Sequence, residues 1–294
     1  MSTTYITTGE NKSSKQRALI SRILSYVFLI FVSFLALFPL YILIINSTRT
    51  GNEIAGGFTL IPGGAIVDNF TAAWSDPNMV LWRGLLNSLF VAAVSSVLSV
   101  YFSAMTAYGI HVYDFKGKNV AFKFILLIMT IPTQVAAVGF VALVRQINLN
   151  NTYWPLIIPA IAAPATFFYM KQYMESTLPL EVIEAARVDG SNEFKTFNII
   201  ALPMMKPAMA VQLIFAFTAS WNNYFTPMLI LDKADLRTLP IMINTLRGNI
   251  ASGNATALGR IYMTMLIAIL PVVIVYICVS KHIVQGVALG AVKG

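Results

Sequence analysis

Six long apolar segments constrain the fold of this 294-residue chain more than any other feature of its sequence. A membrane-spanning helix needs about 20 predominantly apolar residues. The segments that meet this requirement are residues 23–45, 84–110, 123–144, 154–174, 208–231 and 261–281. Charged residues make up only 11% of the chain, whereas soluble domains contain about a quarter. The sequence therefore predicts an all-α integral membrane protein with six transmembrane helices.

The distribution of Lys and Arg predicts how these helices are oriented. Cytoplasmic loops of membrane proteins carry an excess of both residues. With the N-terminus inside, thirteen of the 20 Lys and Arg residues fall on the cytoplasmic side. We therefore expect two cytoplasmic tails, residues 1–22 and 282–294, and a cytoplasmic loop over 175–206. The loops 46–83 and 232–260 would be extracytoplasmic. The net charge of +8 is then explained by cytoplasmic cations, and we expect no nucleic-acid partner.

The first apolar segment follows a basic stretch, as the apolar region of a secretory signal peptide does. Its length exceeds the 7–15 residues of such a region, and no small-residue cleavage site ends it. We therefore expect residues 23–45 to be retained as the first transmembrane helix.

The predicted spans contain almost no charged residues, and Lys171, near the inner end of its helix, is the exception. Intramembrane charges usually mark proton relays, ion sites or voltage sensors, so the sequence argues against these functions. It also has no HExxH motif and no Walker A sequence, and its single cysteine, Cys278, cannot form an intramolecular disulfide. We expect no catalytic residue, metal or cofactor in this chain. Energy for uphill transport would therefore come from another subunit.

Several polar side chains lie within the predicted spans. Such residues can line a solute pathway or hydrogen-bond between helices, and helix packing is the favoured interpretation for Asn87, Gln134 and Gln212. The run Trp221-Asn222-Asn223-Tyr224 places two amides between aromatic rings, which suits sugar binding by stacking and hydrogen bonds. The candidate pathway residues are Trp221, Asn222, Asn223, Tyr224, Gln134 and Asn87.

Prolines and small residues predict further details of the helices. Proline removes a helical hydrogen bond and bends a helix. Bends are expected at Pro132, at Pro159 and Pro164, and near Pro227. The second span carries a row of small residues at a spacing of four, which predicts close helix packing; the row is Ser95, Ser99, Ser103 and Ala107.

The polar loop 175–206 has the pattern of two short helices joined by a turn. Pro179 can begin the first helix, on which Leu180, Ile183, Ala186 and Arg187 share a face. Asp189-Gly190 is a turn signal, since glycine readily adopts the left-handed conformation that ends a helix. Ser191 can cap the second helix, with Glu193 in its first turn.

The second helix carries an apolar stripe of Phe194, Phe197 and Ile200, and we expect it to end at Leu202-Pro203. Three interpretations of the whole loop are possible. It could pack on itself, it could be a DNA-binding helix-turn-helix, or it could present a knob to a soluble partner. The flanking spans argue against DNA binding.

At this loop the chain resembles the permease subunits of binding-protein-dependent ABC importers. The resemblance rests on a spaced motif. Glu-Ala-Ala is followed after three residues by Gly, after nine more residues by Ile, and after one more residue by Leu-Pro. The matching residues are Glu184, Ala185, Ala186, Gly190, Ile200, Leu202 and Pro203, accompanied by Asp189. The C-terminal residues 285–294 and the segment Asp68-Asn69-Phe70 are similar to the maltose-type second permease of carbohydrate uptake systems.

The resemblance implies a type I ABC importer permease fold with a core over residues 84–281, in the cytoplasmic membrane of a prokaryote. The segment 184–195 would be a coupling helix that fits a groove on an ATPase and passes its motion to the membrane helices. The implied partners are two copies of that ATPase, which binds Mg-ATP, a second homologous permease and an extracytoplasmic solute-binding protein. The implied substrate is a di- or oligosaccharide.

Two alternatives to a sugar permease stay open at this point. The chain could carry another solute, such as an amino acid, phosphate or a polyamine. It could also be a membrane scaffold that uses the same loop without conducting anything.

Overall fold

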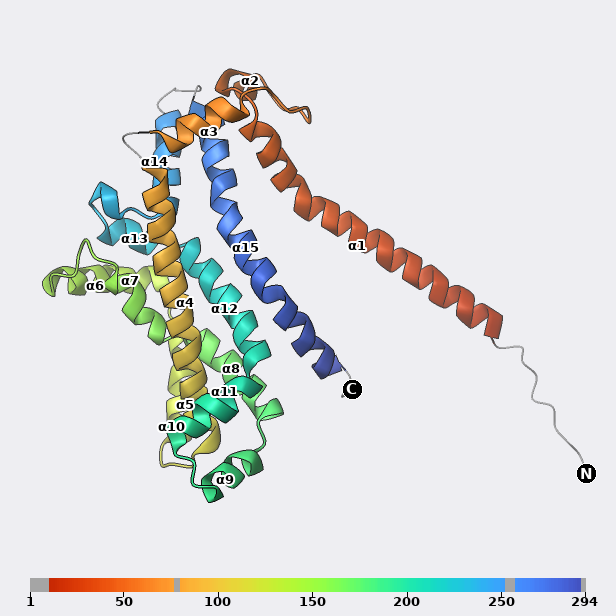
Figure 1. The fold of residues 1–294 in the computed structure, drawn as a ribbon, viewed down its shortest axis with the longest axis vertical. Coiled ribbons are helices and arrows are strands. Elements are labelled where there is room, and N and C mark those ends of the chain that lie inside the picture. Colours follow the sequence, from red (N-terminus) through yellow and green to blue (C-terminus); the bar gives the residue numbers. More distant parts are fainter. Residues whose placement is uncertain (1–10, 77–79, 252–256, 292–294) are drawn as a thin grey trace, which may run out of the picture.

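The computed structural model describes residues 11–76, 80–251 and 257–291, and all regular structure within these ranges is helical (Figure 1). Helix α4 (Leu81–Val112) lies at the centre. It packs against α8 (Pro164–Thr177) and α12 (Lys206–Trp221), and α12 packs in turn against α15 (Leu258–Ala291).

Small side chains explain why α4 occupies the centre. The predicted row Ser95, Ser99, Ser103 and Ala107 is at most 4% exposed. Small residues allow neighbouring backbones to approach closely, and two of the hydroxyls point to the backbone of the fourth apolar segment. Ser95 Oγ lies 3.4 Å from the carbonyl of Leu156, and Ser103 Oγ lies 3.4 Å from that of Ala163. The predicted packing surface is confirmed.

Three of the described helices are long and apolar enough to cross a membrane as single elements. They are α1 (Asn11–Ser47), α4 and α15, which confirms long helices in the first, second and sixth apolar segments. The expected tails 1–22 and 282–294 are partly helical, because α1 begins at Asn11 and α15 continues to Ala291. Residues 1–10 and 292–294 of those tails lie outside the described residues.

The third and fourth apolar segments are interrupted, so neither forms one continuous helix. In the third, α5 (Lys118–Ile128) and α6 (Thr133–Gln146) are separated by a turn that ends at Pro132. In the fourth, α7 (Trp154–Ile157) runs into a 3₁₀ turn, η1 (Ile158–Ile161), and Pro164 begins α8. Proline supplies no amide hydrogen and clashes with the preceding turn, which places these breaks where bends were expected.

The fifth apolar segment breaks at residues 222–224, between α12 and α13 (Phe225–Ile230). The expected bend near Pro227 is therefore in the wrong place, because Pro227 lies inside α13 and is buried. An Asn side chain competes with helical hydrogen bonds, and Asn223 Oδ1 accepts a hydrogen bond from the Thr226 amide at 3.4 Å. The paired asparagines, rather than the proline, mark the break.

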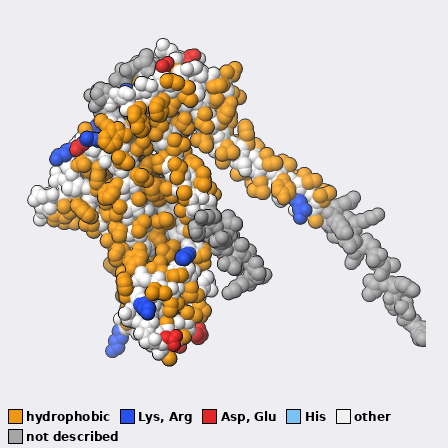
Figure 2. All heavy atoms as spheres, in the orientation of Figure 1, with side chains coloured by type: hydrophobic (Ala, Val, Ile, Leu, Met, Phe, Trp, Pro, Cys, Tyr) orange, Lys and Arg blue, Asp and Glu red, His pale blue; other side chains and the backbone are white. Residues whose placement is uncertain are grey.

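Polar residues gather at the two ends of the molecule, and apolar side chains cover much of the face between them (Figure 2). One end holds α2 (Gly51–Ala55), α3 (Ile66–Trp74), η3 (Ala234–Leu236) and α14 (Leu239–Ala251). The opposite end holds the 175–206 loop (Figure 1). Helix α1 meets α15 near the first end and then diverges from it, with most of its apolar side chains exposed.

Asn69, within the segment that resembles carbohydrate permeases, stabilises the junction at the first end. Its Nδ2 donates to the carbonyls of Ser47 and Arg49, both at 2.8 Å. Asn69 itself is only 9% exposed. Gly259 lies against it, and a Cβ there would come within 2.7 Å of the Arg49 carbonyl. Asn69 therefore ties the end of α1 to α3 and to the start of α15.

Candidate functional site

The first helix of the 175–206 loop, α9 (Leu180–Val188), begins after Pro179, as predicted. Ile183 and Ala186 face inward at 1% and 7% exposure. Leu180 and Arg187 are exposed instead, so the expected common face of four residues is split. Because residues four apart lie on one side of a helix, Leu180, Glu184 and Val188 form a separate outward row. We call this row the outer face of α9.

The outer face is open to solvent in the described structure. Val188 is 88% exposed and Leu180 is 42% exposed. Glu184 and the neighbouring Ala185 are also exposed. An apolar side chain as exposed as Val188, beside a carboxylate, is suited to contact with another protein.

A Schellman motif ends α9 and fixes its direction. Gly190 has φ +78°, in the left-handed region, which glycine occupies without steric cost. Its amide donates to the carbonyl of Arg187 at 3.0 Å, and the Ser191 amide donates to that of Ala186 at 2.9 Å. These two hydrogen bonds define the motif, and the predicted glycine turn is confirmed.

The second helix of the loop differs from expectation at its start. Asn192, not Ser191, caps α10 (Glu193–Thr196), because Asn192 Oδ1 accepts from the Lys195 amide at 2.8 Å. Ser191 Oγ instead accepts from Thr196 Oγ1 at 2.9 Å. The expected apolar stripe is also divided: Phe197 is 3% exposed, but Phe194 is 69% exposed.

The Ile-x-Leu-Pro part of the loop joins α10 to the membrane core. A π-helical turn, η2 (Phe197–Ala201), leads into α11 (Leu202–Met204). The chain then bends by 82° between Glu193–Met204 and α12. Ile200 is partly buried in the π turn, Leu202 packs against the core, and Pro203 is exposed. The helical stretch that begins with α10 ends at Met204, one residue after the predicted end at Leu202-Pro203. π turns are frequent at functional sites.

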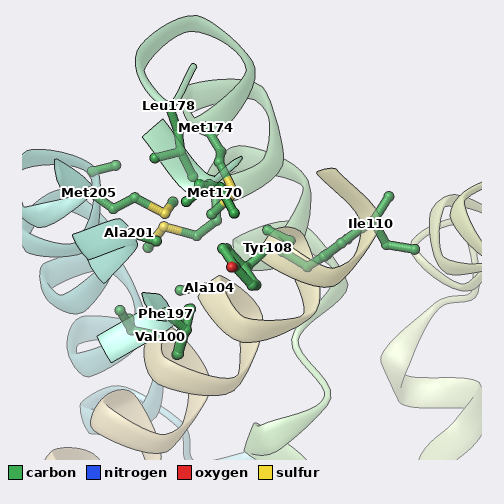
Figure 3. Packing of buried hydrophobic residues seen from close by; sticks show 14 residues of the cluster. Val100, Ala104, Tyr108, Ile110, Met170, Met174, Leu178, Phe197, Ala201 and Met205 are labelled. Atoms are coloured by element: carbon green, nitrogen blue, oxygen red, sulfur yellow. The ribbon is translucent and has the colours of Figure 1, made fainter. Parts of the chain in front are cut away.

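An apolar cluster seats the loop on α4 and α8 (Figure 3). Three methionines have no exposed surface: Met170 and Met174 of α8, and Met205 just before α12. Methionine fills irregular gaps because its side chain is unbranched and flexible. Other buried members of the cluster are Val100, Ala104, Tyr108, Phe167, Leu178, Ile183, Phe197 and Ala201. The inner side of the loop is thus part of the protein core.

Four polar and aromatic residues link the two loop helices to α4, and we call them the polar clamp. Arg187 Nε donates to Glu193 Oε1 at 2.7 Å, and Tyr108 Oη donates to Glu193 Oε2 at 3.2 Å. The Arg187 guanidinium lies 5.4 Å from the Tyr113 ring centroid. Its hydrogen bond to Glu193 holds the pKa of that carboxyl below its ordinary value. Glu193 thereby joins both loop helices to the end of α4.

Sequence reasoning did not identify the polar clamp. It placed Glu193 in the first turn of a helix but gave no role to Tyr108 or Tyr113. The Tyr108–Glu193 hydrogen bond joins residues 85 positions apart, and the helical pattern of either segment carries no signal for such a contact.

The predicted pathway residues are only partly brought together. Trp221, Asn222 and Tyr224 line a cavity of about 610 Å³ between α12, α14, α15 and the end of α1. Trp221 is 4% exposed. Its Nε1 donates to the Ala268 carbonyl at 3.2 Å, and its ring stacks on Phe217 at 5.7 Å. Most of the Trp221 ring therefore serves helix packing.

The other candidates lie elsewhere. Asn223 is exposed at the helix break, and Gln134 is exposed on α6. Asn87 Nδ2 donates to the carbonyls of Asp235 and Arg237 at 2.9 and 3.0 Å, so it fastens the loop after α13 to α4. Two cavity residues that sequence reasoning missed, Asn244 and Arg247, come from α14. Both residues lie within 232–260, which was expected to be a loop. The sequence analysis did not predict the helix α14 in this loop.

Comparison with known proteins agrees with this architecture. The family described as binding-protein-dependent transport system inner membrane component matches residues 99–288. The chain is 37% identical over 280 residues to the arabinooligosaccharides transport system permease protein AraQ of Halalkalibacterium halodurans, covering 93% of this chain and 98% of that protein. It is 29% identical over 273 residues to the lactose transport system permease protein LacG of Rhizobium radiobacter, covering 92% and 96%.

The fold is also similar to a solved structure. A chain from the crystal structure of a bacterial ABC transporter involved in the import of the acidic polysaccharide alginate superimposes with a TM-score of 0.73. The two chains are 21% identical, and the match covers 95% of this chain and 99% of that one. This chain belongs to the family of inner membrane components of binding-protein-dependent transport systems, and it has the fold of a type I ABC importer permease.

Proposed function

We propose that this chain is the permease subunit of an ATP-driven importer that carries a di- or oligosaccharide across the cytoplasmic membrane. The two named relatives belong to arabinooligosaccharide and lactose systems, which supports a saccharide over an amino acid, phosphate or a polyamine. Their match over nearly the whole chain also supports a conducting subunit over a scaffold.

The observation that carries the proposal is the outer face of α9 on a rigid support. Leu180, Glu184 and Val188 point away from the protein while Ile183 anchors the same helix in the core. Such a helix fits a groove on a partner and cannot move without moving its support. We propose that segment 184–195 docks on an ABC ATPase, with Ala185 allowing close approach.

Motion of the ATPase would reach the membrane helices by two routes. The polar clamp joins the loop to α4, and the π turn with Ile200, Leu202 and Pro203 joins it to α12 at the 82° bend. Ala186 and the Asp189-Gly190 turn keep α9 in a fixed direction. These contacts form a discrete packed unit, the kind of element that coupling between distant sites requires.

The membrane arrangement of the proposal has six spans with both termini in the cytoplasm. The interrupted third, fourth and fifth segments would span as broken helices, whose freed backbone groups face a protein-lined pathway. The basic start of α1 and the 175–206 loop lie toward the same end of the molecule (Figure 1), as this orientation requires. The complex would contain two ATPase copies that bind Mg-ATP, a second homologous permease and an extracytoplasmic solute-binding protein.

Reconstitution tests the proposal. The complex purified with its ATPase, second permease and binding protein should take up oligosaccharide into liposomes only with ATP inside. Val188→Asp should abolish uptake and weaken ATPase binding, because it replaces the exposed apolar side chain of the outer face with a second carboxylate. Val120→Asp changes a residue that is 71% exposed on α5 and serves as the matched control. Normal uptake by the Val188 variant would contradict docking through α9.

A further inference from the structure

A second, smaller cavity adjoins the helix break. It measures about 260 Å³. The residues that line it are Tyr224, Met228, Leu231, Asp232, Arg237, Ile241, Asn244 and Thr245. Tyr224 and Asn244 also line the 610 Å³ cavity. These two side chains therefore form a partition between two neighbouring cavities.

A hydrogen bond closes this partition. Asn244 Nδ2 donates to Tyr224 Oη at 2.7 Å, and Tyr224 Oη donates to the sulfur of Met228. Tyr224 lies in the break between α12 and α13, and Asn244 lies on α14. The partition thus joins the helix break to α14, which follows it in the chain after α13 and η3.

The smaller cavity has the chemistry of a saccharide site. Asp232 supplies a carboxylate acceptor, Arg237 supplies guanidinium donors, and Asn244 and Thr245 supply an amide and a hydroxyl. Among the described residues, no ion pair or side-chain hydrogen bond occupies the Arg237 guanidinium. Within the same part of the chain, the Asp232 carboxylate accepts one side-chain contact, from Asn151 Nδ2 at 3.5 Å. Both groups are available to sugar hydroxyls.

The charge and the volume of the smaller cavity limit the class of ligand that it can bind. One carboxylate and one guanidinium compensate each other, so the smaller cavity favours a neutral group over an anion. Pockets that enclose a whole small ligand measure about 300–1,000 Å³. The smaller cavity lies below this range and the larger cavity lies within it. The smaller one therefore suits a single terminal sugar unit.

We propose that Tyr224, Asp232, Arg237, Asn244 and Thr245 form a subsite for one end unit of a neutral oligosaccharide, with Tyr224 and Asn244 dividing it from the larger cavity. This inference rests on the proposed transport function. In this proposal, α14 and the loop before it make most of the contacts with the neutral sugar. Trp221 then has a packing role and no role in the subsite.

Protection of a thiol by substrate tests the subsite. Thr245→Cys is made in a Cys278→Ser background, and the complete complex with its binding protein is placed in liposomes. A membrane-impermeant methanethiosulfonate is added outside, with or without a neutral oligosaccharide during uptake. The oligosaccharide should slow modification at position 245 severalfold. It should leave modification of an Asn52→Cys variant, on exposed α2, unchanged.

A second measurement keeps the test independent of thiol chemistry. Asn244→Leu leaves the hydroxyl of Tyr224 without its donor and should lower oligosaccharide uptake about tenfold, while Asn52→Leu should have no effect. Co-purification of the ATPase confirms that each variant assembles.

The outcomes separate the subsite from the transport function. If the unmodified complex takes up no oligosaccharide, the proposed function itself is wrong. If it does take up oligosaccharide but position 245 is not protected and Asn244→Leu transports normally, the subsite is wrong. Protection by a uronic-acid oligosaccharide or a phosphorylated solute, but not by a neutral one, would overturn the neutral assignment.

Discussion

Replacement of Gly190 by valine is the sharpest test of the loop's geometry. Gly190 has φ +78°, and a Cβ added there would meet nothing within 4 Å. A Cβ at this position therefore meets no neighbour, and the main effect of a substitution comes from the backbone conformation. Valine is β-branched and strongly disfavours the left-handed region, whereas asparagine tolerates it.

The expected magnitude follows from this geometry. An L-residue other than glycine costs about 1–2 kcal/mol in the left-handed conformation, which lowers the ratio of correct to altered turn roughly 5- to 30-fold. The Schellman hydrogen bonds at 2.9 and 3.0 Å depend on that turn. Ile183, at 1% exposure, still anchors α9. We therefore expect Gly190→Val to assemble in the membrane with a misdirected coupling helix.

The assay is ATP-driven oligosaccharide uptake by reconstituted complexes, with ATPase activity measured in parallel. Gly190→Val should lose most of its uptake, Gly190→Asn should lose much less, and both should be present in the membrane in normal amounts. If the valine variant transports like the wild type, or if asparagine is as harmful as valine, the reasoning from the left-handed turn is refuted.

Three further predictions concern the supports of the loop and of the opposite end. Glu193→Gln removes the charge of the polar clamp and should lower uptake per ATP hydrolysed while leaving assembly intact, in a side-by-side uptake and ATPase assay. Arg187 lowers the folded-state pKa of Glu193, so the clamp's contribution to stability is present above the ordinary carboxyl pKa and is lost as the pH falls through the folded-state pKa. The thermal unfolding temperatures of wild type and Glu193→Gln should therefore converge in acid. A difference that stays constant with pH would argue against the ion pair. Ile183→Ala removes a buried side chain and should destabilise the loop by about 2–5 kcal/mol, seen as faster proteolysis at 175–206, whereas Leu180→Ala on the outer face should leave proteolysis unchanged. Gly259→Ala places a Cβ against Asn69 and the Arg49 carbonyl and should cost about 1–3 kcal/mol in detergent thermal stability, whereas Gly64→Ala, with nothing within 4 Å, should not.

The sequence predicted the parts of the fold that depend on local pattern. Long apolar runs gave α1, α4 and α15, the small-residue row gave the buried face of α4, and Asp189-Gly190 gave the turn. Each of these rests on spacing within one segment or on the conformation of one residue. The distribution of Lys and Arg predicted the orientation of the helices in the membrane, and this orientation stays a prediction.

The parts that depend on distant contacts could not be predicted. The break in the fifth segment lies at the asparagines before Pro227, because the local hydrogen bond of Asn223 competes with the helix. Leu180 on α9 and Phe194 on α10 are exposed because α4 and α8 cover the other side of each of these two helices. Packing was the favoured interpretation for Asn87, but the sequence did not identify its partners Asp235 and Arg237, which lie about 150 positions away. No sequence spacing contains these pairings.

The most direct test of the central claim is photo-crosslinking from position 188 in native membranes. A photoreactive amino acid replaces Val188, which is 88% exposed on the outer face, and the cross-linked protein is identified by mass spectrometry. Docking of α9 on an ATPase predicts that an ABC ATPase subunit is captured. Capture of a different protein, or of none, in membranes where the chain is assembled and active would contradict the account.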